Sequence, residues 1–163
     1  MVEPDQKRKT LANMVISEET LIVPGVFDML SAKIAAQEKH HAIYMSGYAT
    51  VASHLGLPDA GLASYAEMVE RAAAIASSVD IPLIADTDTG FGGLLNIRHT
   101  VKGFERAGVS AIQIEDQEFP KKCGHTTGRR VIPVGEMVQK IEVAVESRTD
   151  SNFLIIARTD ART

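Results

Sequence analysis

The sequence predicts an α/β fold in which helices cover a parallel sheet. Short apolar runs alternate along the 163 residues with longer segments whose apolar residues recur every three or four positions. The runs are apolar on both faces, as in a parallel sheet buried between layers. An open doubly wound sheet and a barrel both fit this alternation. We favour the barrel, because polar residues gather at the carboxyl ends of the strands and no dinucleotide-binding fingerprint follows the first strand.

Five apolar runs are predicted to be strands. Each is bounded by glycine, proline or polar residues, as residues 21–23 are closed by Pro24 and Gly25. A complete barrel takes eight strands and about 250 residues, so this chain is expected to contain roughly the first five strands. The predicted strands cover residues 21–23, 42–45, 82–85, 111–114 and 153–157.

Helices are predicted between these strands. Residues 1–18 are a polar, helix-compatible leading segment, and residues 19–163 hold the strands and the intervening helices in a single domain. Ser64 and Glu67 form a capping box, which predicts that a helix begins after Ser64. Helical spacing is shown by Phe27, Leu30 and Ile34, by Met68, Val69, Ala72, Ile75, Ala76 and Val79, by Ile97, Val101 and Phe104, and by Val134, Met137, Val138, Ile141, Ala144 and Val145.

The composition excludes several classes of protein. With 45% hydrophobic residues, the chain can bury one real core. A formal charge of -4 and an isoelectric point near 5.7 argue against a nucleic-acid partner, so the ligand should be small. The N-terminus lacks a signal-peptide core, and no apolar stretch approaches the roughly 18 residues of a membrane span. A single cysteine fits a reducing compartment, so we expect a soluble cytoplasmic protein.

Three carboxylates end adjacent predicted strands. Asp86 and Asp88 follow the third strand and Glu115 ends the fourth, without compensating bases nearby in the sequence. Because the carboxyl ends of barrel strands meet at one mouth, we expect these side chains to converge. Magnesium takes oxygen ligands and keeps several waters, so one carboxylate would bind it directly and the others through water; manganese could replace it. The alternative is that these acids cap helix N-termini.

Polar residues around the second strand could bind a substrate. Ser46 and Gly47 end this strand, where a hydroxyl and a free amide could hold a carboxylate or oxyanion, although an ordinary turn explains them equally well. Tyr44 and Tyr48 flank them; either phenol could face the cavity and exchange a proton, and Tyr44 could equally be core. Asp59 fits a turn residue by composition, in a loop on the same side of the sheet.

Arg158 ends a wholly apolar strand, where an unpaired charge would be costly to bury. We therefore expect its guanidinium to face an anion, which could be Asp160, a carboxylate of the site or the substrate. Four histidines have no partner at the spacing of metal ligands and are predicted to be structural or exposed. They are His40, His41, His54 and His99.

The loop of residues 121–125 carries the only cysteine. Cys123 lies between two lysines and His125, and neighbouring positive charge favours a thiolate, so Cys123 could exchange a proton near neutral pH. Gly124 lets the loop adopt shapes that a side chain would forbid. By itself this pattern also fits a basic surface turn, and the acidic strand ends are what favour a catalytic loop.

Together these residues resemble the isocitrate lyase and phosphoenolpyruvate mutase superfamily, over essentially the whole chain from Leu21 to Thr163. The Lys-Lys-Cys-Gly-His segment is the signature of its lyases and is quite specific. The matching segments are residues 44–47 with 56–59, 86–93, 114–117, 121–125 and 157–161.

This resemblance implies a TIM-type (β/α)8 barrel and a magnesium-dependent carbon-carbon lyase. Its substrate would be a small 2-hydroxy di- or tricarboxylate of the 2-methylisocitrate, 2-alkylmalate or oxaloacetate type, cleaved by a retro-aldol step that leaves an enolate. By resemblance, Asp86 would bind magnesium directly and Asp88 and Glu115 through water, and the 2-oxo acid half would be held by Ser46, Gly47 and Arg158. Cys123, on a loop that closes over the substrate, would protonate the enolate, with Lys121 and His125 supporting its charge.

The resemblance leaves the reaction open between several members. At Tyr48 the chain resembles the members that cleave 2-alkylmalates and oxaloacetate, because methylisocitrate lyases tend to have a small residue at this position. One rival is a phosphonate-forming mutase such as carboxyvinyl-carboxyphosphonate phosphorylmutase, which has less need of the cysteine. The other is a non-catalytic half-barrel. The family's later strands and its C-terminal helix, often exchanged between subunits, are missing here, and a homo-oligomer, a tetramer in the family, is expected for a longer form.

Overall fold

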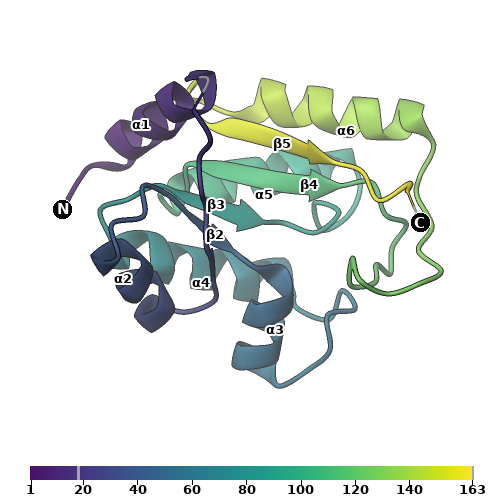
Figure 1. Cartoon of the computed structure of the whole chain (residues 1–163). Coiled ribbons are helices and arrows are strands. Elements are labelled where there is room, and N and C mark those ends of the chain that lie inside the picture. The colour runs from purple at the N-terminus through teal and green to yellow at the C-terminus, as the bar shows by residue number, and fades with distance from the viewer. Residues whose placement is uncertain (18, 163) are drawn as a thin grey trace.

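The computed structural model describes residues 1–17 and 19–162, which form a parallel five-stranded sheet with helices on its outside (Figure 1). The strands are β1 (Gly25–Val26), β2 (Ile43–Met45), β3 (Leu83–Asp86), β4 (Ala111–Glu115) and β5 (Leu154–Arg158). They are hydrogen-bonded in sequence order, and each neighbouring pair is parallel. A doubly wound sheet reverses its strand order at a switch point, so this order is that of a barrel segment, as predicted.

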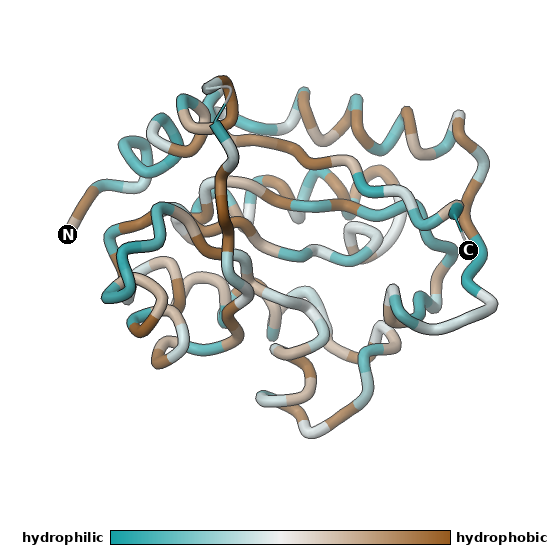
Figure 2. The backbone as a smooth tube through the Cα atoms, in the orientation of Figure 1, coloured by the Kyte–Doolittle hydropathy of each residue, from teal (hydrophilic) through white to brown (hydrophobic). Residues whose placement is uncertain are grey.

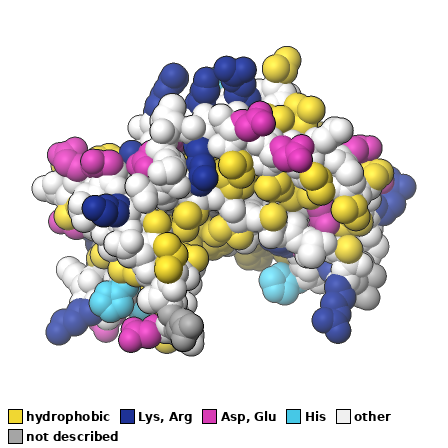
Figure 3. All heavy atoms as spheres, turned by 90° about the horizontal axis from the view of Figure 1, so that it is seen from above, with side chains coloured by type: hydrophobic (Ala, Val, Ile, Leu, Met, Phe, Trp, Pro, Cys, Tyr) yellow, Lys and Arg dark blue, Asp and Glu magenta, His cyan; other side chains and the backbone are white. Residues whose placement is uncertain are grey.

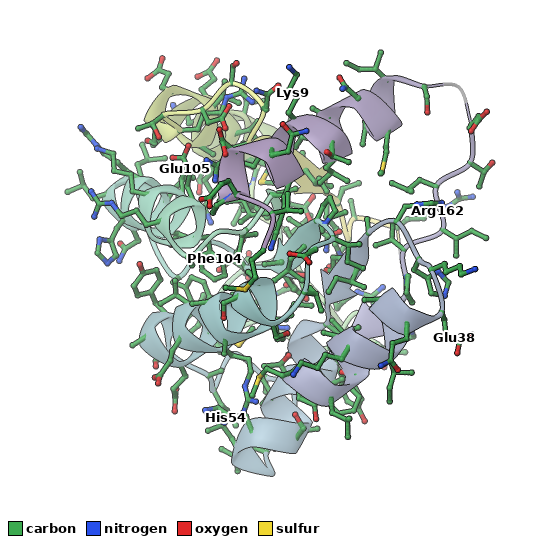
Figure 4. The ribbon with its side chains drawn as sticks, turned by 90° about the vertical axis from the view of Figure 1, so that its left-hand side faces the viewer. Lys9, Glu38, His54, Phe104, Glu105 and Arg162 are labelled. Carbon is green, nitrogen blue, oxygen red and sulfur yellow. The ribbon has the colours of Figure 1, made fainter. Side chains whose placement is uncertain are left out.

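Four helices follow the strands around the outside of the sheet. They are α2 (Met29–Gln37), α4 (Tyr65–Ser78), α5 (Leu94–Arg106) and α6 (Val134–Ser147), and each packs against the next. The main core lies between them and the sheet. In it Phe104, fully buried between α4 and α5 in Figure 4, meets the ring of Tyr65 edge to face with ring centres 6.3 Å apart. Within the described residues, no helix combines the length and the apolar character needed to cross a membrane.

The opposite face of the sheet, which we call the inner face, carries a smaller apolar cluster. Alternate strand residues point to it, and the register aligns Tyr44 with Ile84 and Ile84 with Ala111. The cluster contains Leu11, Ala42, Ile84 and Ala111, with Leu21, Val23, Tyr44, Leu154 and Ile156 packed against it. Seen from above in Figure 3, the molecule is hollowed on one side and hydrophobic side chains line the hollow. Figure 2 shows the strands as largely hydrophobic stretches between more polar loops.

Helix α1 (Pro4–Ile16) lies across the amino-terminal ends of the strands. Lys7, only 5% exposed, donates from its ammonium to the carbonyl groups of Ala76 and Val79 at the end of α4. Arg8 donates to Asp150 at 2.6 Å, just before β5. These contacts attach the leading helix to the segments that precede β3 and β5 and leave the carboxyl ends of the strands free.

The first strand differs from its prediction. β1 lies at Gly25–Val26 and not at residues 21–23. The backbone N–H of Tyr44 donates to the carbonyl of Pro24 at 3.0 Å, so pairing with β2 begins only at the proline. Ile22 is 69% exposed, whereas its neighbours Leu21 and Val23 pack on the inner face. Residues 21–23 thus point alternately to the inner-face cluster and to solvent, and they are not part of the hydrogen-bonded sheet.

Helix α3 (Gly47–Leu55) was not predicted from the sequence. The hydroxyl of Ser46 accepts a hydrogen bond from the backbone N–H of Ala49 at 3.3 Å, and Gly56 ends the helix in the left-handed conformation with φ of 65°. Ser46 and Gly56, as residue types that favour the two ends of a helix, were the sequence signal that could have predicted α3. The helix begins directly where β2 ends, so the Ser46-Gly47 pair is a helix start as well as a strand end.

Candidate active site

The carboxyl ends of β3, β4 and β5 bring the predicted polar residues onto the inner face. Asp86, Glu115 and Arg158 are the last residues of these three strands. The register aligns Asp86 with Gln113 and Glu115 with Arg158, so these side chains leave the sheet on the same side. Asp86 and Glu115 are 8% and 2% exposed. The strand ends therefore form a buried acidic site with one arginine at its side.

Lys121 lies among these carboxylates. Its ammonium is 2.5 Å from Asp59 Oδ1 and 2.7 Å from Asp88 Oδ1, and its side chain is 4% exposed. The sequence showed no compensating base near Asp86 and Asp88, and the fold supplies one, because a lysine from a later loop enters the cluster. In the structure the Lys121 ammonium forms ion pairs with two carboxylates, whereas the resemblance implied that it supports the charge of Cys123. Asp59, a turn residue by composition, is a buried partner in this ion pair.

Burial and mutual repulsion favour the protonated forms of the site carboxyl groups. Burial is the main cause that raises the pKa of Glu115 to about 8; Asp86 and Asp88 add to the rise, and Lys121 and Arg158 oppose it. Burial, with the charge of Asp86, raises the pKa of Asp88 to about 6. For Lys121, burial lowers the pKa, but the attraction of Asp88 and its other partners outweighs burial and raises it, so the ammonium stays charged. The site holds more carboxylates than its two cations neutralise.

Arg158 contacts two of the three anions proposed for it. Its Nη1 is 3.3 Å from Glu115 Oε2, and its Nη2 donates to both carboxylate oxygens of Asp160 at 3.0 Å. The side chain is 28% exposed, so the guanidinium stays accessible to a ligand. The two anions that the protein itself could supply, Asp160 and a carboxylate of the site, are thus both partners of Arg158.

The residue types at the site fit a magnesium ion held mainly through water. Glu115 Oε1 is buried and has no hydrogen-bond partner among the described residues, a state that calls for a water or a cation. Asp86 and Asp88 supply further oxygen atoms, the ligand type magnesium prefers. Within residues 1–17 and 19–162, no three acidic, imidazole or thiol side chains are arranged so that they could hold a metal ion as they stand. One direct carboxylate ligand is compatible with this geometry, and a full cage of protein ligands is not.

The start of α3 holds Asp86 in place. The backbone N–H of Gly47 donates to Asp86 Oδ2 at 3.3 Å, so the amide that we expected to be free for a substrate already has a partner. The helix-capping alternative for the strand-end acids therefore applies in part to Asp86. A Cβ atom at Gly47 would lie 2.7 Å from Asp86 Oδ2, so the close approach requires glycine. Ser46 uses its hydroxyl to cap the helix.

The loop that carries Cys123 folds over the Arg158 side of the site. Cys123 is half-buried, and its Sγ is 3.8 Å from His125 Nδ1. Gly124 lies against Arg158, so close that a side chain there would collide with the guanidinium. Lys122 donates to the carbonyl of Gly128 at 3.1 Å. Both lysine ammonium groups thus have partners other than the thiol, and the imidazole is the basic group beside it.

Tyr44 lies both against the apolar cluster and next to the polar site, so its two interpretations are compatible. Its phenol oxygen accepts a hydrogen bond from Gln113 Nε2 at 2.8 Å. Burial above all, and then the charge of Asp86, raises the pKa of Tyr44, which keeps the phenol neutral. Gln113 was not singled out in the sequence, although it is the polar residue inside an apolar strand. Tyr48, on the first turn of α3, is 58% exposed.

The chain belongs to the phosphoenolpyruvate mutase and isocitrate lyase superfamily, a superfamily of enzymes. The family model described as phosphoenolpyruvate phosphomutase matches residues 11–163. The 2,3-dimethylmalate lyase of Eubacterium barkeri is 47% identical over 153 residues, which are 94% of this chain and 53% of that protein. The chain spans about half the length of the curated relatives it matches.

Solved structures share the fold of this chain. Oxaloacetate acetylhydrolase in complex with the inhibitor 3,3-difluorooxalacetate matches with a TM-score of 0.93 and 40% identity, over 98% of this chain and 55% of that one. Phosphonopyruvate hydrolase in complex with oxalate and Mg2+ matches with a TM-score of 0.86 and 35% identity, over 99% of this chain and 53% of that one. The similar proteins include a lyase, hydrolases and a mutase, so the comparisons establish the superfamily and not the reaction.

Proposed function

We propose that a protein containing this chain is a magnesium-dependent carbon-carbon lyase that cleaves a small 2-hydroxy di- or tricarboxylate. The observation that carries the proposal is the position of the Cys123 loop, which folds over Arg158 at the edge of a buried carboxylate cluster. A retro-aldol cleavage requires a cation for the substrate carboxylate, oxygen ligands for a metal and a proton donor, which here is carried by a loop. The similarity to a 2,3-dimethylmalate lyase supports the same reaction class.

In this proposal each residue has a separate task. Arg158 binds a substrate carboxylate through its exposed guanidinium edge. Asp86, Asp88 and Glu115 would hold magnesium, which when bound polarises oxygen atoms of the substrate. The substrate 2-hydroxyl gives its proton to the carboxylate cluster, the bond between C2 and C3 breaks, and the electron pair stays on the departing carbon as an enolate. The Cys123 thiol gives a proton to that carbon.

The metal part of the proposal is tested by calorimetry. Because the pKa of Glu115 is raised to about 8 and that of Asp88 to about 6, magnesium must displace protons, and its affinity should rise as the pH increases from about 6 to about 8. Asp86→Asn should abolish binding. Asp150→Asn, at the opposite end of the sheet beside Arg8, is the matched control and should bind normally. Undiminished magnesium affinity in Asp86→Asn would remove the metal assignment.

The chemical part is tested with the full-length protein and a panel of 2-hydroxy acids assayed for pyruvate, glyoxylate or oxalate release. Cys123→Ser should lower kcat by orders of magnitude with little change in KM, because a proton donor acts in the transition state. His125→Asn should also lower kcat, whereas His54→Asn, at an exposed position of α3, should not. Near-normal turnover of Cys123→Ser would contradict the catalytic role of the thiol.

The same panel separates the rival reactions. Formation of a phosphonate from a phosphoenolpyruvate-type substrate, followed by phosphorus NMR, would replace the lyase with a mutase. Release of inorganic phosphate from a phosphonate would indicate a hydrolase. Binding of oxalate without any turnover would favour a non-catalytic acid-binding module.

A further inference from the structure

Gln117 joins the Cys123 loop to the body of the sheet. Its side chain is 2% exposed, and each polar position of its amide is used. The carboxamide oxygen accepts from the backbone N–H of Lys122 at 3.0 Å, and Nε2 donates to the Lys122 carbonyl at 2.9 Å and to Asp160 Oδ2 at 2.8 Å. Both backbone groups of the residue that precedes Cys123 are therefore held by one buried side chain.

Asp160 fixes the direction of this amide. It receives two hydrogen bonds from Arg158 Nη2, so the carboxylate that orients Gln117 is also the partner of the proposed substrate-binding arginine. Arg158 meets the loop a second time at Gly124, which lies against its guanidinium. The loop is thus attached to the arginine both directly and through Asp160 and Gln117.

Beyond Lys122 the loop is held together by its own contacts. Arg129 Nη1 donates to the carbonyl groups of Gly124 and Thr126 at 2.5 and 2.6 Å. Residues 124–129 are therefore tied to one another. They are attached to the sheet on one side by residues 130–132, whose backbone pairs with residues 116–118, and on the other side by the segment just before Cys123. Gln117 provides two of the hydrogen bonds at that point.

We propose that Gln117 is a positioning residue that holds the Cys123 loop closed against Arg158. Opening the loop breaks both hydrogen bonds to Lys122 and leaves the buried amide of Gln117 with its bond to Asp160 only, which favours the closed form. Gln117 does not act on the substrate in this proposal; it sets how often the thiol is covered. The meaning of closure for catalysis depends on the function proposed above, but the loop equilibrium itself can be measured without substrate.

This equilibrium is measurable in the full-length protein through the rate at which iodoacetamide alkylates Cys123, the one cysteine of these 163 residues, followed on its own peptide by mass spectrometry. Gln117→Met keeps the size of the side chain and removes its three hydrogen bonds, so the alkylation rate should rise by about tenfold or more. Gln117→Asn, too short to reach both Lys122 groups, should raise it as well. Gln139→Met, an exposed site on α6, is the matched control and should stay within about twofold of the unmodified chain.

A second route to the open loop tests whether both contacts act on one equilibrium. Gly124→Ala keeps every atom of Gln117 but makes the loop and the Arg158 guanidinium move apart, which weakens the second contact of the loop, so it should also speed alkylation. In the double variant of Gly124→Ala with Gln117→Met the two effects should multiply, up to the alkylation rate of the unfolded chain, because both variants act on the same equilibrium between closed and open loop. The proposal would be overturned by Gln117 variants that match the Gln139 control with native circular dichroism, or by a double variant no faster than its faster single variant while that rate is still far below the rate of the unfolded chain.

The alkylation test and the turnover test can fail independently of each other. A loop that opens as expected in a full-length protein without lyase activity would refute the proposed function and leave the role of Gln117 intact. In an active protein, Gln117→Met should lower kcat more than it changes KM, since closure follows binding. Normal kcat together with fast alkylation would show that closure by Gln117 is irrelevant to the reaction.

Discussion

Replacing Lys121 by methionine should destabilise the chain strongly, because this ammonium is the counter-charge of two buried carboxylates. The Lys121, Asp59 and Asp88 side chains are 4%, 6% and 9% exposed, and the ion pairs measure 2.5 and 2.7 Å. Methionine has nearly the same length and leaves no large cavity, so the loss of charge is the dominant change.

The expected cost follows from the burial of both partners. Breaking a buried ion pair by removing one member costs about 3–5 kcal/mol, since the remaining charge has no compensation and little water. Asp88 can relieve part of this by taking a proton: burial and Asp86 already raise its pKa to about 6, and the loss of Lys121 raises that pKa further. A carboxyl with a raised folded pKa contributes stability at low pH that is lost as the pH rises through that value. The loss in Lys121→Met should therefore be larger at about pH 8 than at about pH 5.

Urea unfolding followed by circular dichroism, with metal removed by chelation, measures this cost. Lys122→Met is the matched control, because the neighbouring lysine is exposed and, among the described residues, its ammonium donates only to the Gly128 carbonyl. Its effect should stay within about 0.5 kcal/mol. Added magnesium should restore part of the stability of Lys121→Met by binding the freed carboxylates. Equal losses in the two lysine variants at about pH 8 would refute the reasoning.

Two further predictions concern stability. Burial raises the pKa of Asp150, but its hydrogen bonds, led by the one from Arg8, outweigh burial and lower the pKa. The stability that this carboxylate contributes is present above its ordinary pKa and is lost as the pH falls. Asp150→Asn should therefore cost about 1 kcal/mol near pH 7 and less near pH 3 in urea unfolding. Gly47→Ala should cost about 1–3 kcal/mol of stability, because its Cβ would press against Asp86. Gly135→Ala in α6 has open space around it and should be neutral or stabilising. Equal effects of the two variants would contradict the argument from close approach at Gly47.

The parts of the fold that the sequence predicted are those fixed by local pattern. Ser64 and Glu67 form the predicted capping box, with Glu67 Oε2 accepting from the Ser64 backbone N–H at 2.7 Å, and α4 begins at the next residue. β3, β4 and β5 lie within one or two residues of their apolar runs. β1 was misplaced because an apolar run marks burial and not pairing: Leu21 and Val23 are packed on the inner face without belonging to the ladder.

The partners inside the site could be predicted only in part. The strand-end positions of Asp86, Glu115 and Arg158 follow from the alternation of strands and helices. The contact between Lys121 and Asp59 joins two irregular loops that are 62 positions apart, and no periodicity encodes how such loops fold over a sheet. Gln117 was missed for a related reason, since its role depends on the backbone of Lys122 and not on any motif.

The open edges of the sheet predict how a polypeptide of residues 1–163 alone should behave. β1 pairs only with β2 and β5 only with β4, so each has one side without a strand neighbour among the described residues. Next to β5, an apolar hollow of about 460 Å³ is lined by residues including Ile132, Val138 and Ala157, and Val138 is 49% exposed. Exposed strand edges beside apolar surface favour self-association.

The same edges limit catalysis. Asp86, Glu115 and Arg158 lie on neighbouring strands whose spacing a closed barrel would fix, and a displacement of about 1 Å can cost on the order of a hundredfold in rate. Residues 1–163 alone should therefore show little release of 2-oxo acid and should scatter light as oligomers or aggregates. A longer protein that closes the sheet should be active and monodisperse. If residues 1–163 gave a monodisperse monomer with normal enzymatic turnover, the inner face would be complete without further strands, and the argument from barrel closure would be wrong.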